Sequence, residues 1–406
     1  MPRSTPSKST FIGLAAVFAA FFLAAGAPTP LLSLRQQEWG FSAATLSIAF
    51  SIYAIGLLAA LLIGGSLSDH LGRRPVMLLA LYGELLSMAV FIFAPSISWV
   101  IAARALQGLA TGLATSVFNA AIAEHAPPHR KKLAGGLAGA SVAGGLGVGA
   151  LVTGAAVQFT SDANTLIFAI LAVVMVIAVV YVSLTEETVT PRPGAFRSLA
   201  PRLGLPASIR REFGAGLPVH IAGWMFPALF LGLSPALLRV QFGLEGGLVA
   251  GFTAFLGPFT AALAGFYFTR HPARHSTLAG VSLILAGIIV VLVGISASWL
   301  PAIWIGAVLG GVGFGGSFGG QLRLIAPLVE PQQRAGVFAG IYIAAYLAFS
   351  IPVVIAGLLV PTWGIILTLQ AYAATLLAFA ASGVVIQAVR LRREAAEKPL
   401  LVSVDA

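Results

Sequence analysis

The stretch Gly65-Ser-Leu67-Ser-Asp69-His-Leu-Gly72-Arg73-Arg74-Pro75 decides how the rest of this sequence is interpreted. It is short and charged, and it lies between two apolar runs, 42–64 and 76–94. Each run is long enough to cross a hydrocarbon core of about 30 Å as a helix. The stretch is therefore predicted to be a tight, charged turn that joins two membrane spans at one face of a bilayer.

The composition of the whole chain indicates the same class of protein. The chain has 406 residues, of which 58% are hydrophobic and only 9% are charged, and its mean hydropathy is +0.97. A soluble domain carries about 25% charged residues. Length alone would allow two or three soluble domains, but the apolar runs predict an integral membrane protein. Because the chain has no cysteine, disulfides, thiol catalysis and cysteine-ligated metals are excluded.

Apolar runs of spanning length recur along the chain. They predict twelve membrane helices: 11–33, 42–64, 76–94, 98–123, 134–157, 164–184, 214–237, 246–268, 277–296, 299–325, 336–360 and 363–388. The predicted organisation is an N-terminal six-helix bundle over 1–184, a linker over 185–213 with a short surface helix near Ile209–Phe213, a C-terminal bundle over 214–388, and a tail over 389–406.

The basic residues predict the orientation. The formal charge of +10 could suggest a nucleic-acid partner, but the basic residues lie between the spans. Of the 23 Lys and Arg, only Arg35, Arg239 and Arg104 fall outside the N-terminus, the even-numbered loops and the tail. Positive loops stay on the cytoplasmic side, so both termini are predicted to be cytoplasmic, with no nucleic-acid partner.

The two halves of the chain resemble each other weakly. Gly65 corresponds to Gly265 at an offset of 200 residues, and at that offset Arg74 corresponds to Arg274 but Asp69 to Thr269. The second copy of the charged turn is therefore predicted to be degraded.

The pattern G-x-L-x-D-x-x-G-R-R closely resembles the signature loop between helices 2 and 3 of the major facilitator superfamily of transporters. The resemblance implies an all-α membrane fold of two six-helix bundles related by pseudo-two-fold symmetry, with a central site open alternately to each side. The gating residues it implies are Gly65, Asp69, Gly72, Arg73, Arg74 and Glu124.

In that family the aspartate caps the start of helix 11 when the protein faces outward, so Asp69 is expected to contact the backbone near Ala335–Val337. Gly72 would let the turn close, and Glu124 is the expected ion-pair partner of Arg73. Arg73 and Arg74 are expected to face the cytoplasm and lipid headgroups. The alternative is a basic turn that sets topology and has no gating role.

A second motif, Arg104-Ala-Leu-Gln107-Gly108, lies inside the fourth predicted span and resembles the family's span-four motif, whose arginine is associated with proton coupling. An arginine inside a membrane requires a partner, and Glu84 in span three is the candidate counter-charge at a similar depth. The pair is interpreted as the proton-coupling site, and the alternative is a permanent structural ion pair. His220 in span seven is a further proton-coupling candidate or a substrate ligand, unless it is a satisfied histidine near the interface.

Span five is rich in glycine. The run Ala143-Gly-Gly-Leu-Gly-Val-Gly149-Ala150 resembles the superfamily's exporter signature, except that Ala150 replaces the final proline. Close packing of helices explains such a run equally well. In span one, Pro28 and Pro30 must interrupt the backbone hydrogen bonds and bend the helix.

Aromatic side chains are available to line a cavity for an amphiphilic organic ligand. They include Phe21, Phe22, Tyr53, Phe118, Trp224, Phe226, Phe230, Tyr342 and Tyr346. The predicted substrate-binding set is Phe22, Gln107, Phe118, Asn119, Trp224 and Tyr342.

Together these patterns predict a secondary active transporter, most simply a proton-coupled exporter of a drug-like molecule, sugar or metabolite. An uptake permease of the same fold and a non-transporting receptor or scaffold are the alternatives. The sequence has no Walker loop and no H-E-x-x-H cluster, so neither ATP-driven transport, enzymatic activity nor a cofactor or metal is expected. The expected partners are protons, a small-molecule substrate and the lipid bilayer. The chain is predicted to be a monomer in a bacterial inner membrane.

Overall fold

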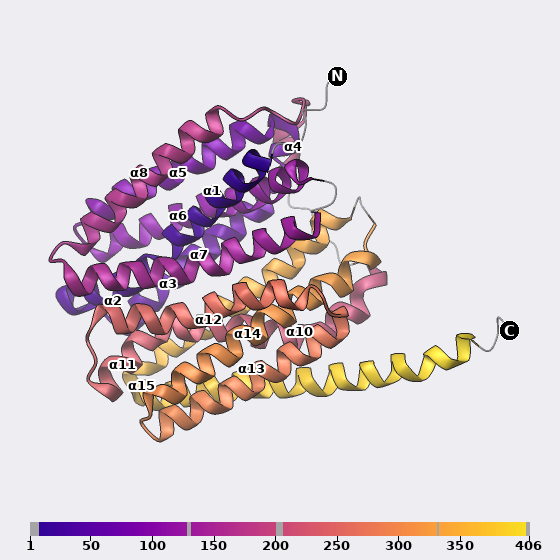
Figure 1. Ribbon diagram of the computed structural model, residues 1–406. Helices are drawn as coiled ribbons and strands as arrows, with labels where there is room; N and C mark the ends of the chain where they lie inside the picture. Colours follow the sequence, from indigo (N-terminus) through magenta and orange to yellow (C-terminus); the bar gives the residue numbers. More distant parts are fainter. Residues whose placement is uncertain (1–7, 128–130, 200–205, 331–332, 403–406) are drawn as a thin grey trace.

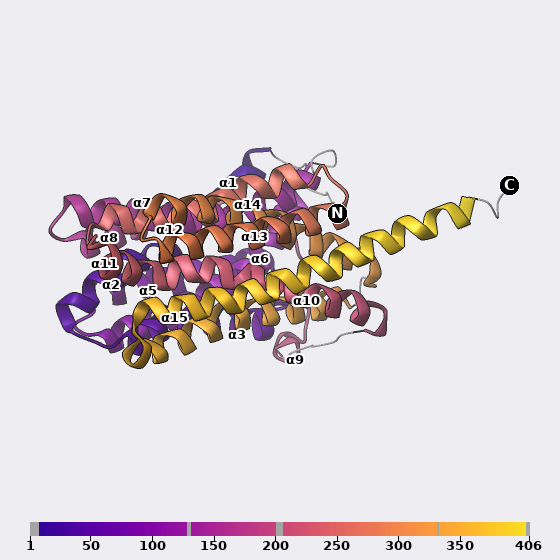
Figure 2. The ribbon, with the colours of Figure 1, turned by 90° about the horizontal axis from the view of Figure 1, so that it is seen from below.

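The computed structural model describes residues 8–127, 131–199, 206–330 and 333–402, and every regular element within these ranges is a helix. The long helices lie side by side, and both ends of the chain lie at the same end of the bundle (Figures 1 and 2). We call this end, where α1 and α5 begin, the termini end. The opposite end is called the far end.

The first half of the chain contains α1 (Lys8–Gly26), α2 (Pro28–Trp39), α3 (Ala43–Gly64), α4 (Ser68–Leu71), α5 (Arg73–Ile92), α6 (Ile97–His125), α7 (Lys131–Phe159) and α8 (Ala163–Ser183). The second half contains α9 (Ala195–Ser198), α10 (Ala207–Ala228), the π-helical turn Leu229–Leu233, α11 (Ser234–Phe242), α12 (Gly247–Phe268), α13 (Ala273–Ser296), α14 (Leu300–Ile325), the 3₁₀ turn Ala326–Leu328 and α15 (Arg334–Val402).

Within the described residues, 11 helical segments have the length and apolar composition needed to cross a membrane. The last of them is α15, which crosses twice. Gly364 interrupts it with a φ of 71°, a conformation that is accessible to glycine because it has no Cβ. The chain turns back there at the far end (Figure 1). The twelve predicted spans and the all-helical fold are therefore confirmed.

One predicted element is wrong. The separate surface helix near Ile209–Phe213 does not exist, because α10 begins at Ala207 and continues without interruption into the seventh span. The predicted tail from residue 389 is helical as far as residue 402. It continues α15 as a helix that projects beyond the bundle (Figure 2), since residues 384–398 contain no Gly or Pro and many strong helix formers.

The predicted bend in the first span is present between α1 and α2, at Ala27. Pro28 has no backbone N–H, so it leaves the carbonyl of Ala24, four residues earlier, without its helical donor. A side chain from another helix therefore has to satisfy this buried carbonyl.

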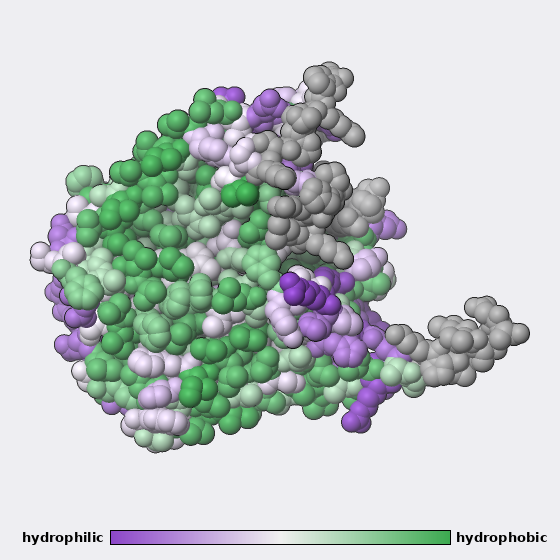
Figure 3. Space-filling view, in the orientation of Figure 1, coloured by the Kyte–Doolittle hydropathy of each residue, from purple (hydrophilic) through white to green (hydrophobic). Residues whose placement is uncertain are grey.

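The outer surface of the bundle is largely apolar, and polar residues gather at its two ends (Figure 3). On α5, Leu79, Tyr82 and Leu86 are each more than half exposed, and on α8 the same holds for Ile170 and Ile177. Such a surface is stable against lipid tails but not against water. The chain is an integral, multi-pass membrane protein.

The two halves pack most closely at the far end. A Cβ built on Gly154 of α7 would lie 2.4 Å from the carbonyl oxygen of Gly247 on α12, and one on Gly251 would lie 2.5 Å from the carbonyl oxygen of Ala150. On the other side of the bundle, Gly357 of α15 lies against Ser47 of α3. Small residues allow these backbones to touch.

Packing is looser at the termini end. Cβ atoms built on Gly135, Gly139, Gly265 and Gly340 would meet nothing within 4 Å. A Cβ built on Gly136 of α7 would lie 2.7 Å from the ring of Phe266 on α12, so the halves meet there through a side chain and not through two backbones. The halves therefore pack closely at the far end and loosely at the termini end.

The glycine run of span five packs on two sides of α7. Gly145 and Gly149 lie against the α1 backbone, at Ala19 and Leu23 respectively, whereas Gly147 lies against Phe255 of α12. The run therefore places α7 between its own half and the opposite one. Close packing accounts for its composition without reference to the direction of transport.

We predict that Gly251→Ala destabilises the protein, whereas Gly265→Ala on the same helix does not. The first substitution overpacks the α7–α12 contact and should cost about 1–3 kcal/mol. The second adds a methyl group in open space and improves helix propensity by up to about 1 kcal/mol. Thermal unfolding of the two variants in detergent tests this, and equal shifts of their midpoints would contradict the packing described above.

Candidate functional site

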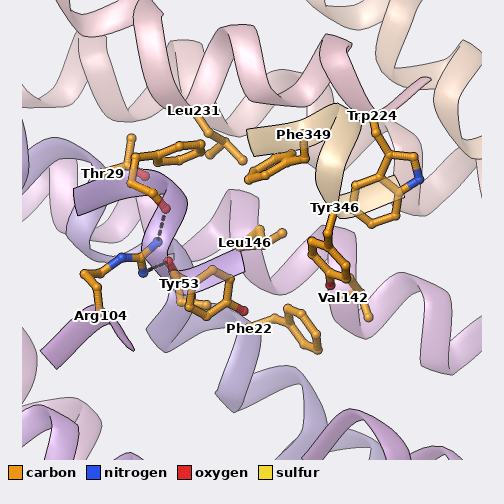
Figure 4. Close-up of a pocket in the computed structure, with 12 residues that line it drawn as sticks. Phe22, Thr29, Tyr53, Arg104, Val142, Leu146, Trp224, Leu231, Tyr346 and Phe349 are labelled. Atoms are coloured by element: carbon orange, nitrogen blue, oxygen red, sulfur yellow. Dashed lines mark hydrogen bonds between the residues drawn. The ribbon is translucent and has the colours of Figure 1, made fainter. Parts of the chain in front are cut away.

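A narrow cavity lies between the two halves. It is lined by Phe22, Ala25, Thr29, Phe50, Tyr53, Arg104, Val142 and Leu146 from the first half and by Trp224, Leu231, Tyr346 and Phe349 from the second (Figure 4). Most of these side chains are apolar or aromatic. Arg104 is the single charged residue among those that line the cavity.

Arg104 is 3% exposed and is held almost entirely by backbone carbonyls. Its Nη1 donates to the carbonyl oxygen of Ala25 at 3.1 Å (Figure 4), and its Nε and Nη2 donate at 3.4 Å to the carbonyls of Ala49 and Phe50. The guanidinium carbon also lies 4.4 Å from the ring centroid of Tyr53. Arg104 therefore joins α6 to α1 and α3 beside the cavity.

Arg104 does not pair directly with Glu84, so this part of the prediction is wrong. Gln107 lies between them: its Oε1 accepts from Arg104 Nη1 at 2.7 Å, and its Nε2 donates to Glu84 Oε1 at 3.0 Å. Gln107 lies one turn beyond Arg104 on α6, so its amide reaches the carboxyl before the guanidinium can. Residue depth alone could not distinguish a direct pair from a bridged one.

Gln107 also satisfies the carbonyl that Pro28 leaves free. Its Nε2 donates to Ala24 at 3.1 Å, so one amide contacts the bend in span one, the arginine and the carboxyl. Glu84 is fully buried, and its Oε2 has no hydrogen-bond partner in the described part of the chain. A carboxyl with one unpartnered oxygen in such a place is a candidate for protonation.

The predicted substrate-binding residues are only partly brought together. Phe22 and Trp224 line the cavity. Gln107 belongs to the buried network, Phe118 packs inside the first half on Phe18 and Phe21, and Asn119 donates to the Thr115 carbonyl of its own helix. Tyr342 stacks on Tyr346 and is not among the residues that line the cavity.

Tyr53 and Tyr346 do line the cavity, although the predicted binding set does not contain them. They stood among the aromatic residues available in the spans, but sequence cannot show which side of a helix faces the opposite half.

His220 lies away from this network, in the second half. It is 2% exposed, packs against Phe213 and Phe318, and neither ring nitrogen has a hydrogen-bond partner among the described residues. Gln321 nearby is also buried and unpartnered, and its Oε1 lies against Gly216, one turn before His220. The proton-coupling role of His220 stays a prediction, without a contact to Glu84 or Arg104.

The charged turn is an ordered structure at the termini end. Gly65 is helical, but Gly72 has a φ of 101°, which explains the requirement for glycine there. Arg73 pairs with Glu124 at 2.8 Å, as the sequence predicts, and with Asp69 at 2.6 Å. Its side chain is only 12% exposed, so the expectation that Arg73 faces the cytoplasm and headgroups is wrong.

Asp69 does not reach the start of the eleventh span here: its bonded partner is Arg73 of its own half. The physical reason is the looser packing of the halves at the termini end, which takes the start of α15 away from the turn. The latch expected for the outward-facing state stays a prediction for that state.

Glu187, in the linker after α8, was not identified from the sequence. Its two carboxylate oxygens accept the backbone N–H groups of Arg73 at 2.8 Å and Arg74 at 2.9 Å. These N–H groups begin α5 and have no helical acceptor, and the helix dipole favours an anion there. The linker also bonds to the turn through Arg192 N–H and His70 carbonyl, so a distant segment holds the turn in place.

The second half has its own ion cluster at the same end. Arg274, at the start of α13, contacts Glu212 of α10 at 2.7 Å and also Glu394 of α15, and Arg390 pairs with Glu212. The second copy of the charged turn has lost its aspartate, yet the arginine keeps carboxylate partners from other helices. Sequence offsets could not reveal these partners, which lie 62 and 120 residues away.

Comparisons with known proteins agree with this architecture. The family model described as Major Facilitator Superfamily matches residues 14–291. The chain belongs to this superfamily of transporters.

Similar proteins include the multidrug resistance protein MdtL of Shigella flexneri serotype 5b, which is 29% identical over 278 residues, covering 61% of this chain and 69% of that protein. The multidrug transporter mfsB of Aspergillus fumigatus is 38% identical over 88 residues, which cover 20% of this chain and 14% of that protein.

Solved structures show the same fold at low identity. A bacterial homolog of the human lysosomal transporter Spinster, in an inward-facing and unoccupied conformation, has a TM-score of 0.74 and 16% identity, covering 95% of this chain and 98% of that one. The human organic anion transporter MFSD10 has a TM-score of 0.67 and 19% identity, covering 94% and 100%.

We predict that Glu187→Gln loosens the charged turn. The substitution removes the negative charge from the α5 N-terminus and leaves one acceptor for two N–H groups, a loss of about 1 kcal/mol, or roughly fivefold in local opening. Hydrogen exchange of residues 66–76 should accelerate accordingly. The control is Glu186→Gln at the neighbouring exposed position, and identical exchange in the two variants would show that Glu187 does not cap α5.

Proposed function

We propose that this transporter exports a small organic compound by alternating access in exchange for protons. Glu84 is the proton site, and the cavity between the halves is the substrate site. The observation that carries the proposal is the hydrogen-bonded chain from Glu84 through Gln107 to Arg104, which joins a fully buried carboxyl to the cavity wall.

Protonation of Glu84 alters the charge balance of this chain. When Glu84 is ionised, its negative charge offsets the positive charge of Arg104, and Gln107 is hydrogen-bonded to both side chains. Once the carboxyl is neutral, the guanidinium is held by neutral groups only, Gln107 Oε1 and the carbonyls of Ala25, Ala49 and Phe50, in surroundings where an unpaired charge is costly. These carbonyls belong to α1 and α3, whose side chains line the cavity, so proton binding and the shape of the cavity are linked.

Alternating access would exchange the closed far end for a closed termini end. The close glycine contacts between α7 and α12 would have to separate, and Asp69 would become free to cap α15 as the termini end closes. Arg73, Glu124 and Glu187 hold the turn in a fixed conformation, so that it can act as a preformed contact surface.

Efflux is favoured by the names of the similar proteins, which include multidrug transporters. The termini end carries the basic loops and would be cytoplasmic, most simply at a bacterial inner membrane. In that orientation the structure is inward-facing. An uptake permease of the same fold is the second candidate and differs only in the direction of coupling.

We expect Glu84→Gln to abolish proton movement coupled to a transported compound. Vesicles containing the purified protein and a pH-sensitive dye inside are exposed to pools of uncharged aromatic compounds, with and without a pH gradient. Wild type should show a compound-dependent proton flux whose sign gives the direction of transport. Glu38→Gln, the same chemical change in the exposed Arg35–Glu38 pair at the far end, is the control and should transport normally.

Transport that continues without proton movement in wild type and Glu84→Gln alike would reject the coupling role of Glu84. The network would then be a structural one, and the protein a uniporter or exchanger. A compound-dependent proton flux of the opposite sign would indicate an uptake permease instead of an exporter.

The orientation can be tested directly, because the chain has no native cysteine. We expect Ser161→Cys, in the exposed far-end loop between α7 and α8, to react with a membrane-impermeant maleimide on intact cells. Ala395→Cys, exposed on the projecting part of α15, should react only after the cells are permeabilised. The reverse pattern would contradict the proposed orientation.

A further inference from the structure

The side chains that line the cavity define the kind of compound that it can hold, beyond the broad class proposed above. Three features determine which compounds the cavity can hold: the charge that lines it, the polar groups that have no hydrogen-bond partner, and the aromatic rings around it. The inference rests on the proposed transport function, because it assumes that this cavity is where substrate binds.

The cavity has no partner for an organic cation. Among the described residues that line it there is no Asp or Glu, and the nearby Glu84 lies behind Gln107 and is fully buried. The charge that does line the wall is the guanidinium of Arg104, which repels cations across a low-dielectric space. One ring face that could attract a cation, that of Tyr53, is already occupied by this guanidinium.

The cavity also lacks a pair of free N–H groups that could hold an organic anion. A carboxylate is held best when two N–H groups of one guanidinium point at it together. Each of the three side-chain nitrogens of Arg104 already donates within the first half, to the carbonyls of Ala25, Ala49 and Phe50 and to Gln107. A carboxylate held by two of these N–H groups would have to break at least one of the bonds through which Arg104 is held.

Two phenolic hydroxyls and one indole N–H are what remains, the latter being Trp224 Nε1, which is buried without a hydrogen-bond partner among the described residues. Tyr53 of α3 is 5% exposed and its hydroxyl is buried without a hydrogen-bond partner. Thr111 lies near it and donates its own hydrogen to the Gln107 carbonyl. Tyr346 of α15 is 6% exposed and makes no hydrogen bond to the described residues. A buried hydroxyl such as that of Tyr53 is costly unless a ligand or water satisfies it.

The two hydroxyls come from opposite halves, and in Figure 4 both point into the space between the walls. The wall of the second half is aromatic: the ring centroid of Tyr346 lies 5.0 Å from that of Trp224, and Trp224 lies 6.2 Å from Phe349. Phe22 and Phe50 face them from the first half. Flat rings can be held by such walls through offset or edge-to-face contacts.

We propose that the cavity binds an uncharged aromatic compound whose hydrogen-bond acceptors, such as carbonyl, ester or nitro groups, receive the hydroxyls of Tyr53 and Tyr346. Such a ligand bonds to both halves at once. The ligand also contacts the Tyr53 ring, which lies against the Arg104 guanidinium. Its binding therefore affects the hydrogen bonds that run from Arg104 through Gln107 to Glu84.

The test uses three probes with the same ring and different charge: methyl 2-naphthoate, 2-naphthoate and 2-naphthylmethylammonium. Equilibrium dialysis against the purified full-length protein in detergent, without any gradient, measures their binding. The ester should bind about tenfold more tightly than either ion, since each ion loses hydration without gaining a partner. Tighter binding of the cation or the anion would overturn the proposal.

The variants Tyr53→Phe and Tyr346→Phe remove one hydroxyl each and keep the rings. Each should weaken ester binding by about threefold to tenfold, the effect of one hydrogen bond. Tyr372→Phe is the control, because the Tyr372 hydroxyl is also buried but donates to the Met225 carbonyl outside the cavity. Unchanged ester affinity in both cavity variants would overturn the proposal.

A second measurement leaves both tyrosines in place. Val142 lines the cavity, so Val142→Cys in the cysteine-free chain should react with a maleimide and should be protected by the ester. Absence of protection at a saturating ester concentration would show that the probe binds elsewhere and would overturn the proposal. These experiments involve no proton gradient, so their failure is distinct from a failure of coupling at Glu84.

Discussion

The structure depends on one electrostatic constraint, the need to hold a guanidinium inside a membrane. Arg104 is buried within the bundle, where an unpaired charge would be prohibitively costly. The protein meets this constraint with backbone carbonyls of two neighbouring helices and with one amide, Gln107, that leads to a buried carboxyl. Because these carbonyls belong to cavity-lining helices, the solution to a stability problem also connects the proton site to the substrate site.

The bend in span one shows how local chemistry serves this arrangement. A proline at position 28 removes the N–H that Ala24 would otherwise bond, and a membrane interior offers no water as a substitute. Gln107 supplies the missing donor. Pro28 and Gln107 are 79 residues apart in the chain, yet the amide of the glutamine satisfies the carbonyl that the proline leaves without a donor. The same principle recurs at the termini end, where Glu187 satisfies the free N–H groups that begin α5.

Small residues determine how the halves meet. Glycines at the far end bring the backbones of α7 and α12 into contact, while equivalent glycines near the termini end face open space. Helices without side chains at their contact can separate and close again without rearranging a packed core. The contrast between the two ends therefore describes a conformation as well as a fold, and it explains why Asp69 pairs within its own half here.

The sequence by itself determined the membrane class, the twelve spans, the bend at Pro28 and the pairing of Arg73 with Glu124. These follow from apolar run length, from missing backbone donors and from a motif whose members are close in the chain or carry scarce charges. Only the tertiary structure decided that Gln107 separates Glu84 from Arg104, that Glu187 caps α5, that Glu212 and Glu394 replace the lost aspartate of the second turn, and that Tyr53 and Tyr346 face the cavity. The physical reason is that the rotation of each helix about its axis is set by packing against its neighbours. In a uniformly apolar span, the sequence pattern carries almost no record of that rotation.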